Sequence, residues 1–254
     1  MALRLALICH AFGTPWWGWS VPSPCDASVM CGRYTLTDPD PRLLRFRFGL
    51  TEQAKIDQAP RYNVAPTDPV LAIRLNRDGE REPGVLRWGL IPHFADPDSF
   101  DRLLINARGE TVAEAPSFRD TFRTHRCLIV ADGLYEWRAE ETGKKPVWIT
   151  LPSKEPFAFA GIWAEARRPD GSSVHSCAIV TCEPGEVVAA VHDRMPVILD
   201  RADESDWLEP GTGEERLQLL LAPTDDLVVT EVSDAVNDVR QDGPALIEPP
   251  LRLF

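Results

Sequence analysis

The chain has 254 residues, 44% of them hydrophobic and 26% charged, and 39 acidic against 27 basic side chains give a formal charge of −12. This composition is that of a globular protein and excludes disordered, collagen-like and coiled-coil chains, and no apolar run approaches the roughly 20 residues that cross a bilayer. The negative charge argues against a protein that coats nucleic acid by bulk electrostatics, so any contact with nucleic acid is expected to be local.

The first 29 residues differ from the rest of the chain. They hold three of the eight tryptophans, carry one Arg and one Asp, and show no periodicity that would place them in a core. A secretion leader is an alternative, but the apolar run is short and no clean small-residue cleavage site follows it. We favour a true start at Met30, so that 1–29 is a mis-assigned or removed leader and 30–254 is a single domain.

Beyond Met30, short segments rich in β-branched and aromatic residues predict strands. These segments are 70–75, 85–91, 127–137, 146–151, 157–165, 175–182, 196–200 and 227–233. Helices are predicted at 39–48, 110–123, 184–191, 202–208 and 213–221. Strands and helices do not alternate regularly, which disfavours a doubly wound parallel sheet. We therefore expect a β-rich α+β fold with a mostly antiparallel, barrel-like sheet and peripheral helices.

Common catalytic and cofactor-binding motifs are absent from the sequence. There is no phosphate-binding GxxxxGK[ST], no dinucleotide-binding GxGxxG, no HExxH and no GxSxG. The six cysteines include no CxxC pair and lack the even spacing of a secreted disulfide scaffold. We expect no metal and no cofactor, and a protein of the reducing cytoplasm.

Cys31 is the first candidate for chemistry. If Met30 is removed, Cys31 carries a free α-amine with a pKa of about 7.7 to 8.0 beside a thiol with a pKa near 8.5, so both are partly active nucleophiles at neutral pH. Such a 1,2-aminothiol reacts with aldehydes, because the amine condenses with the carbonyl and the thiol closes a five-membered thiazolidine. The alternative is a small, buried cysteine with no chemical role.

Three further polar residues stand in unusual surroundings. Asn106 precedes Arg108 in LLINARGET, where it can also cap a following helix. Glu136 lies between aromatic residues, and apolar surroundings suit a carboxyl that transfers protons, although a rim carboxylate paired with Arg138 is an equal alternative. His192 follows a predicted helix, where a structural role is common. With Cys31 they make a nucleophile, an orienting amide and two proton carriers, a set that also fits a cysteine hydrolase.

Eight motifs in order resemble those of the SOS-response-associated peptidase (SRAP) family, and the match covers nearly all of 30–254. The motifs are MCGRYTL, RYNVAPT, RWGLIP, INARGET, DGLYEW, VTCEP, VHDRMPVIL and VSDAVNDVRQDGPALI. The resemblance implies a β-rich α+β domain with a positively charged groove. It also implies an activity, the shielding of abasic sites in single-stranded DNA by a covalent DNA–protein crosslink, within the DNA damage response.

The resemblance assigns a role to each candidate. It implies that Cys31 is the nucleophile, that Asn106 holds its amine, that Glu136 shuttles protons during ring opening and imine formation, and that His192 polarises the sugar oxygen. It implies contacts to phosphates or nucleotides for a set of five residues, Arg33, Asn63, Arg108, Thr181 and Arg194. Where some members place two tryptophans, this chain has His93 and Phe94, and we expect Phe94 to stack against a base.

The family pattern also leaves alternatives open. An N-terminal extension would acylate the amine of Cys31 and abolish thiazolidine chemistry, so it must be absent from the active protein, and self-cleavage of a leader would use the same thiol. A cysteine peptidase with His192 as base is the second hypothesis, and a non-covalent reader of modified DNA is the third. The expected partner is single-stranded DNA containing abasic sites, bound by a monomer that is nucleoid-associated when on DNA.

Overall fold

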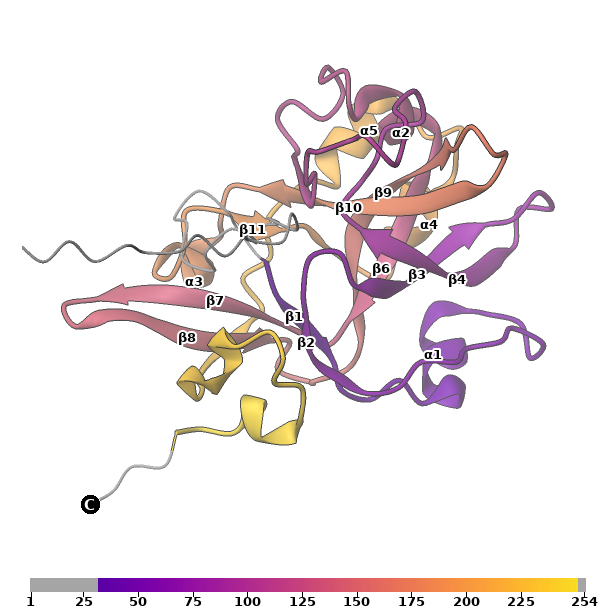
Figure 1. Cartoon of the computed structure of the whole chain (residues 1–254). Coiled ribbons are helices and arrows are strands. Elements are labelled where there is room, and N and C mark those ends of the chain that lie inside the picture. The colour runs from indigo at the N-terminus through magenta and orange to yellow at the C-terminus, as the bar shows by residue number, and fades with distance from the viewer. Residues whose placement is uncertain (1–31, 251–254) are drawn as a thin grey trace, which may run out of the picture.

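The computed structural model describes residues 32–250, so the predicted extension at 1–29 lies outside the described residues. Two β-sheets form the body of the described chain, and short helices lie around them (Figure 1). The strands are β1 (Tyr34–Leu36), β2 (Arg61–Val64), β3 (Pro69–Leu75), β4 (Arg81–Trp88), β5 (Asn106–Arg108), β6 (Arg126–Ala131), β7 (Gly133–Glu140), β8 (Gly143–Thr150), β9 (Phe157–Arg167), β10 (Ser173–Cys182), β11 (Met195–Pro196), β12 (Ile198–Leu199) and β13 (Val228–Glu231). The helices are α1 (Pro41–Phe48), α2 (Arg119–Thr124), α3 (Glu186–Ala189), α4 (Glu204–Leu208) and α5 (Glu214–Leu219), with 3-10 turns η1 (Asp234–Asn237) and η2 (Pro244–Ile247).

The larger sheet closes on itself. Its strands follow the order β11-β10-β4-β3-β6-β9-β12, and β10 also pairs with β9, so β10, β4, β3, β6 and β9 form a closed ring. Closure removes the free edges of these strands. Its pairs are antiparallel except those that β10 makes with β4 and β5. The expected β-rich, mostly antiparallel, barrel-like α+β fold is therefore confirmed.

The second sheet has the order β13-β8-β7-β1-β2, and all of its pairs are antiparallel. Its β7–β8 hairpin projects away from the barrel, and the C-terminal turns pack beside it (Figure 1). A small core separate from that of the barrel lies there, built around Tyr135, Trp148, Val236 and Leu246. This core anchors the C-terminal segment to the sheet that contains the predicted acid Glu136.

The segment 127–137, which the sequence predicts as one strand, is two strands in different sheets. The break falls at Asp132, which is buried and accepts hydrogen bonds from Thr35 Oγ1 at 2.6 Å and Thr37 Oγ1 at 2.7 Å. At the next residue, Gly133, a Cβ atom would lie 2.2 Å from Trp148 Nε1. The chain therefore passes from the larger sheet to the second sheet at two residues. The carboxylate of Asp132 is held by hydrogen bonds, and at Gly133 there is no space for a side chain.

The predicted helix at 39–48 is confirmed as α1. The Asp40 carboxylate accepts from the N–H groups of Arg42 and Leu43, and Gly49 ends the helix with a φ of 62°. Both ends therefore follow from capping residues that are visible in the sequence.

The predicted helix at 110–123 is wrong over most of its length, because only α2 is helical there. Separate turns precede it, in which Thr111 N–H donates to Arg108 O and Glu114 N–H donates to Thr111 O. Pro116 lacks an N–H and disfavours helical geometry in the residue before it, so no continuous helix forms.

Among the remaining elements, β3, β9 and β10 extend beyond their predicted ranges 70–75, 157–165 and 175–182, whereas others are shorter than predicted or were not predicted. The predicted helices at 184–191, 202–208 and 213–221 are the shorter α3, α4 and α5, and β4 ends at Trp88 because Gly89 has a φ of 125°. The short strands β1, β2 and β5 were missed.

Within residues 32–250, no helix is long and apolar enough to cross a membrane.

Candidate functional site

Cys31 lies outside the described residues, but its covalent neighbour Gly32 is described. Tyr34 pairs with Leu134, and Tyr135 N–H donates to Arg33 O at 3.0 Å, so the chain entering β1 runs antiparallel to β7. Extending this antiparallel register by two residues places Gly32 opposite Glu136. The described start of the chain therefore leads along β7 directly past the predicted acid.

Glu136 is a buried residue of β7. Only 2% of it is exposed, and it pairs in register with Val147 of β8. Arg138 binds Glu140 Oε1 at 2.9 Å and Glu231 Oε1 at 2.6 Å farther along the hairpin. The alternative of a rim carboxylate is therefore wrong. A buried carboxyl is compatible with the predicted proton-transfer role, which stays a prediction.

Asn106 and Arg108 lie on β5, which runs parallel to β10. Asn106 pairs with Ile179 and Arg108 with Thr181, and Gly109 N–H donates to Thr181 O at 2.7 Å. The helix-capping alternative for Asn106 is wrong, because it lies within a strand and turns follow it. The Arg108 side chain is exposed to solvent, and Asn106 is half-buried.

His192 lies in the turn after α3, where its N–H donates to Val188 O at 2.9 Å. Its Nδ1 lies 3.2 Å from Arg194 N and 2.9 Å from Asp193 Oδ1. These contacts belong to different protonation states, since Nδ1 accepts from a backbone N–H only when it is unprotonated. A neutral ring that accepts from Arg194 carries its proton on Nε2, whereas a ring with a proton on Nδ1 donates to Asp193.

Arg194 is held by β10 and by a carboxylate that sequence reasoning missed. Its guanidinium binds both oxygens of Glu110, one of them at 2.8 Å from Nη2, and Nη2 also donates to Thr181 O at 3.0 Å. The hydrogen bonds raise the pKa of Arg194 and lower that of Glu110. Glu110 stands four residues after Asn106 in the same motif, INARGET, which is the one sequence feature that marks it.

Arg33 and Asn63 are buried and contact each other. Arg33 Nη1 donates to Asn63 Oδ1 at 2.9 Å and to Val236 O at 2.8 Å, and Asn63 Nδ2 donates to Gln241 O at 2.9 Å. Burial lowers the pKa of Arg33. Both side chains thus hold the 236–241 segment in place by hydrogen bonds to its carbonyl groups. Their direct contact with DNA stays a prediction.

Phe94 has an exposed aromatic ring. It is 64% exposed, and its ring meets that of His93 edge-on at a centroid distance of 5.3 Å. One face of an exposed ring is enough for stacking on a base, so the geometry is compatible with the predicted role.

The three cysteines of the described chain are all buried and free. Burial raises the pKa of Cys127 to about 12 and that of Cys182 to about 11, and it raises the pKa of Cys177 as well. The nucleophile of cysteine chemistry is the thiolate, so these three thiols are poor nucleophiles at neutral pH.

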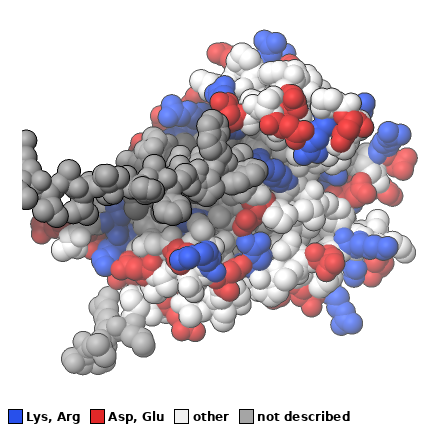
Figure 2. Space-filling view, in the orientation of Figure 1, with Lys and Arg blue, Asp and Glu red and all other residues white. Residues whose placement is uncertain are grey.

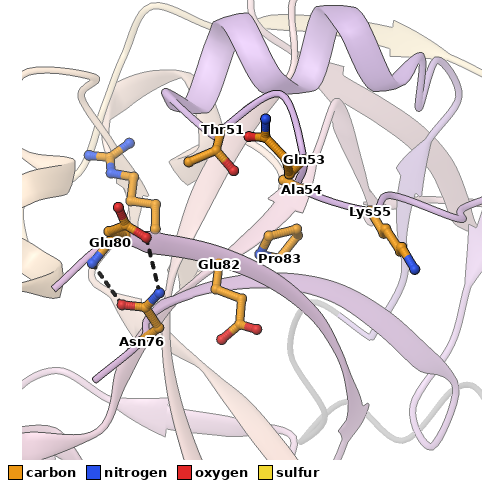
Figure 3. Close-up of a pocket in the computed structure, with 9 residues that line it drawn as sticks. Thr51, Gln53, Ala54, Lys55, Asn76, Glu80, Glu82 and Pro83 are labelled. Atoms are coloured by element: carbon orange, nitrogen blue, oxygen red, sulfur yellow. Dashed lines mark hydrogen bonds between the residues drawn. The ribbon is translucent and has the colours of Figure 1, made fainter. Parts of the chain in front are cut away.

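Other surface features do not mark a competing site. Figure 2 shows acidic and basic side chains interspersed over the visible described surface rather than separated by sign. An open pocket of about 340 Å³ lies between the loop after α1 and the β3–β4 hairpin, where Asn76 binds Glu80 (Figure 3). Its lining includes none of the residues predicted from sequence. In residues 32–250, no group of three or more His, Cys, Asp or Glu side chains is placed to hold a metal ion.

The structure thus places the predicted residues in two groups. One group lies around β10 and comprises Asn106, Arg108, Thr181, His192 and Arg194. The other lies on the second sheet, where Arg33 and Asn63 contact each other and Glu136 is buried in β7. Phe94 stands apart on a loop between β4 and β5.

Comparison with known proteins adds an independent line of evidence. Residues 30–239 match the family described as SOS response associated peptidase (SRAP). A Bacillus subtilis relative named abasic site processing protein YoqW is 41% identical over 230 residues, covering 86% of this chain and 99% of the relative. A relative from Gallus gallus named abasic site processing protein HMCES is 31% identical over 223 residues, covering 75% of this chain and 66% of the relative.

Solved structures share the fold. A crystal structure of a Bacteroides thetaiotaomicron protein superposes with a TM-score of 0.76 at 23% identity, covering 87% of this chain and 100% of the other. One from Bordetella bronchiseptica superposes with a TM-score of 0.68 at 27% identity, covering 80% of this chain and 100% of the other.

Proposed function

Because the chain belongs to the SOS response associated peptidase (SRAP) family, we propose that it processes abasic sites in single-stranded DNA by becoming covalently attached to them. The name of the relative YoqW supports abasic-site processing as the activity. The covalent step follows from the chemistry of an N-terminal cysteine. The protein that performs it is residues 31–254, in which Cys31 has a free amine and one domain carries the whole site.

The reaction joins the aminothiol of Cys31 to the ring-opened sugar. The amine attacks the C1′ aldehyde to give a carbinolamine, which loses one water to form an imine. The thiol then adds to the imine carbon and its proton passes to nitrogen, which closes a thiazolidine. The net change is protein plus DNA minus one water, with no oxidant or cofactor required.

Proton transfers are assigned to Glu136, and polarisation of the sugar oxygen is assigned to His192. Glu136 takes a proton from the attacking amine and returns one to the departing hydroxyl, so the carboxylate is regenerated. His192, in the tautomer that the Arg194 N–H favours, donates a hydrogen bond from Nε2 to the sugar oxygen and keeps its proton. Asn106 holds the amine, Arg108, Arg194 and the rest of their predicted set contact phosphates or nucleotides, and Phe94 stacks against a base.

One observation carries this proposal more than any other: the described chain enters β1 alongside β7, where the buried carboxyl of Glu136 lies. A residue bonded to Gly32 has its Cα about 3.8 Å from that of Gly32. Gly32, the residue to which Cys31 is bonded, therefore lies in the strand register that leads past Glu136.

The test uses residues 31–254, made with a removable tag that leaves Cys31 at the N-terminus. This protein is incubated with a single-stranded oligonucleotide that carries one abasic site and then denatured. We expect a shifted band that Cys31→Ser lacks and that an added N-terminal residue also abolishes. If Cys31→Ser retains binding and no denaturation-resistant band forms, a non-covalent reader is favoured. If the protein turns over added peptides instead, the peptidase hypothesis is favoured.

A further inference from the structure

Glu110 makes an unusual contact for an acidic residue near a proposed DNA-binding surface. Its two carboxylate oxygens bind the two terminal nitrogens of Arg194, one of the arginines proposed to contact phosphates. Such paired contacts fix the guanidinium in both position and orientation. The Arg194 side chain is only 12% exposed, whereas that of Glu110 is 46% exposed, so the pair is shielded from solvent on the arginine side and open on the carboxylate side.

The same arginine connects Glu110 to His192, which is proposed to polarise the sugar oxygen. The Arg194 N–H donates to His192 Nδ1, and the Arg194 side chain donates to Thr181 O and Oγ1 on β10. Glu110 lies two residues beyond the end of β5, and the N–H of the intervening Gly109 donates to the same Thr181 carbonyl. The ion pair therefore ties the turn that carries His192 to the strand that carries Asn106, through one residue of β10.

From these contacts we propose that Glu110 is a positioning residue, which fixes Arg194 and thereby holds His192 as the Nε2–H tautomer facing the reaction. The proposal rests on the proposed function. Glu110 does not touch the sugar. Its carboxylate also places a negative charge near two arginines proposed to bind phosphates, since Arg108 acts on it electrostatically. Its removal should therefore slow the chemistry without weakening the binding of DNA.

The test compares Glu110→Gln with the unaltered protein, both as residues 31–254. The rate of crosslinking is measured at saturating abasic-site DNA. Affinity is measured separately with an oligonucleotide containing a tetrahydrofuran abasic analogue, which has no aldehyde. We expect the rate to fall about tenfold, and the dissociation constant for the analogue to stay equal or fall. An unchanged rate, or a lower rate with equally weakened binding, would overturn the proposal.

Two controls exclude a general loss of structure or charge. Glu165→Gln removes the same charge from an ion pair with Arg167 at the exposed β9–β10 hairpin, and it should leave both quantities unchanged. The double variant Glu110→Gln with Arg194→Gln should be no slower than Arg194→Gln alone, because residues that act as a unit are not additive.

A second readout does not depend on DNA, so a failure of the proposed function is distinguishable from a failure of this inference. The tautomer of His192 is read from the imidazole ¹⁵N shifts at neutral pH in the free protein. We expect the Nε2–H tautomer in the unaltered chain and a mixture of tautomers in Glu110→Gln. The same tautomer in both proteins contradicts the inference whether or not any crosslink forms.

Discussion

At the scale of single residues, the proposed chemistry depends on Glu136, whose carboxyl is buried although carboxyl groups ordinarily remain in water. Replacement of Glu136 by Gln preserves shape and burial but removes proton transfer. We expect the crosslinking rate to fall by about 10²- to 10⁴-fold, the usual contribution of a general acid–base group. The measurement is single-turnover kinetics with abasic-site DNA.

The matched control is Glu140→Gln on the same strand, where the carboxylate binds Arg138 at the exposed end of the hairpin. It should keep the full rate. If Glu136→Gln reacts as fast as this control, Glu136 has no part in the proton transfers.

Thiol chemistry gives a pH-dependent prediction. Burial raises the pKa of Cys182 to about 11, above that of an exposed thiol, so its neutral form persists as the pH rises until the pH approaches 11. At pH 8 the three buried thiols should resist iodoacetamide for hours in the native protein and react fully in denaturant. Peptide mapping by mass spectrometry locates the label. Rapid native labelling of Cys182 would show that this cysteine competes with Cys31.

Residue types that carry chemistry were identifiable from sequence motifs, but their partners were not. Nothing in the spacing of Glu110 and Arg194, 84 positions apart, predicts their ion pair. Likewise, the alternatives for Asn106 and Glu136 were decided by strand pairing and burial. Both depend on segments that meet only in the folded chain.

At the scale of elements, the switch between β6 and β7 sets where Glu136 lies. Replacement of Gly133 by Ala places a methyl group 2.2 Å from Trp148 Nε1 and 2.9 Å from Thr35 Oγ1. We expect the free energy of unfolding to fall by about 2–3 kcal/mol, as overpacked cores do. Denaturant titration measures the change.

Gly213→Ala is the control for this variant, because a Cβ there meets nothing within 4 Å and the residue has a φ of −64°. It should lower stability by no more than about 1 kcal/mol, because alanine is a poorer N-cap residue of α5 than glycine. Equal stability of the two variants would mean that the junction relaxes freely and does not fix the start of β7.

Long strands and capped helices were predictable because their determinants are local. The seven-residue β3 and the Asp40-capped α1 are examples. The three-residue β1 and β5 are too short to show a period, and the strand break at Asp132 depends on Thr35 and Thr37, which lie more than 90 positions away in sequence. Pairing partners distant in sequence therefore explain most of what the sequence did not predict.

At the scale of the whole molecule, a buried charge cluster joins α1, β4 and α4. Glu204 is fully buried and binds Arg47 Nη1 at 2.7 Å and Arg81 Nη1 at 3.0 Å. Replacement by Gln leaves two partly buried cations without their shared counter-charge. We expect a loss of about 3 kcal/mol in the free energy of unfolding, with proposed crosslinking retained below the unfolding transition.

The comparison for Glu204→Gln is Glu214→Gln, whose carboxylate lies 3.8 Å from Arg123 in a pair that is more than half exposed. It should shift the denaturation midpoint little, since exposed pairs contribute about 0–1 kcal/mol. A similar small shift for Glu204→Gln would show that the cluster does not contribute to global stability.

If the N-terminal aminothiol of Cys31 joins the sugar, the crosslinked product has a defined mass. Residues 31–254 are incubated with single-stranded DNA bearing one abasic site, denatured, and analysed by intact mass spectrometry. We expect the mass of protein plus DNA minus one water, with the sugar remnant mapped to Cys31 after nuclease and protease digestion. A product attached elsewhere, or unmodified protein beside intact abasic DNA, would rule out the proposed crosslink.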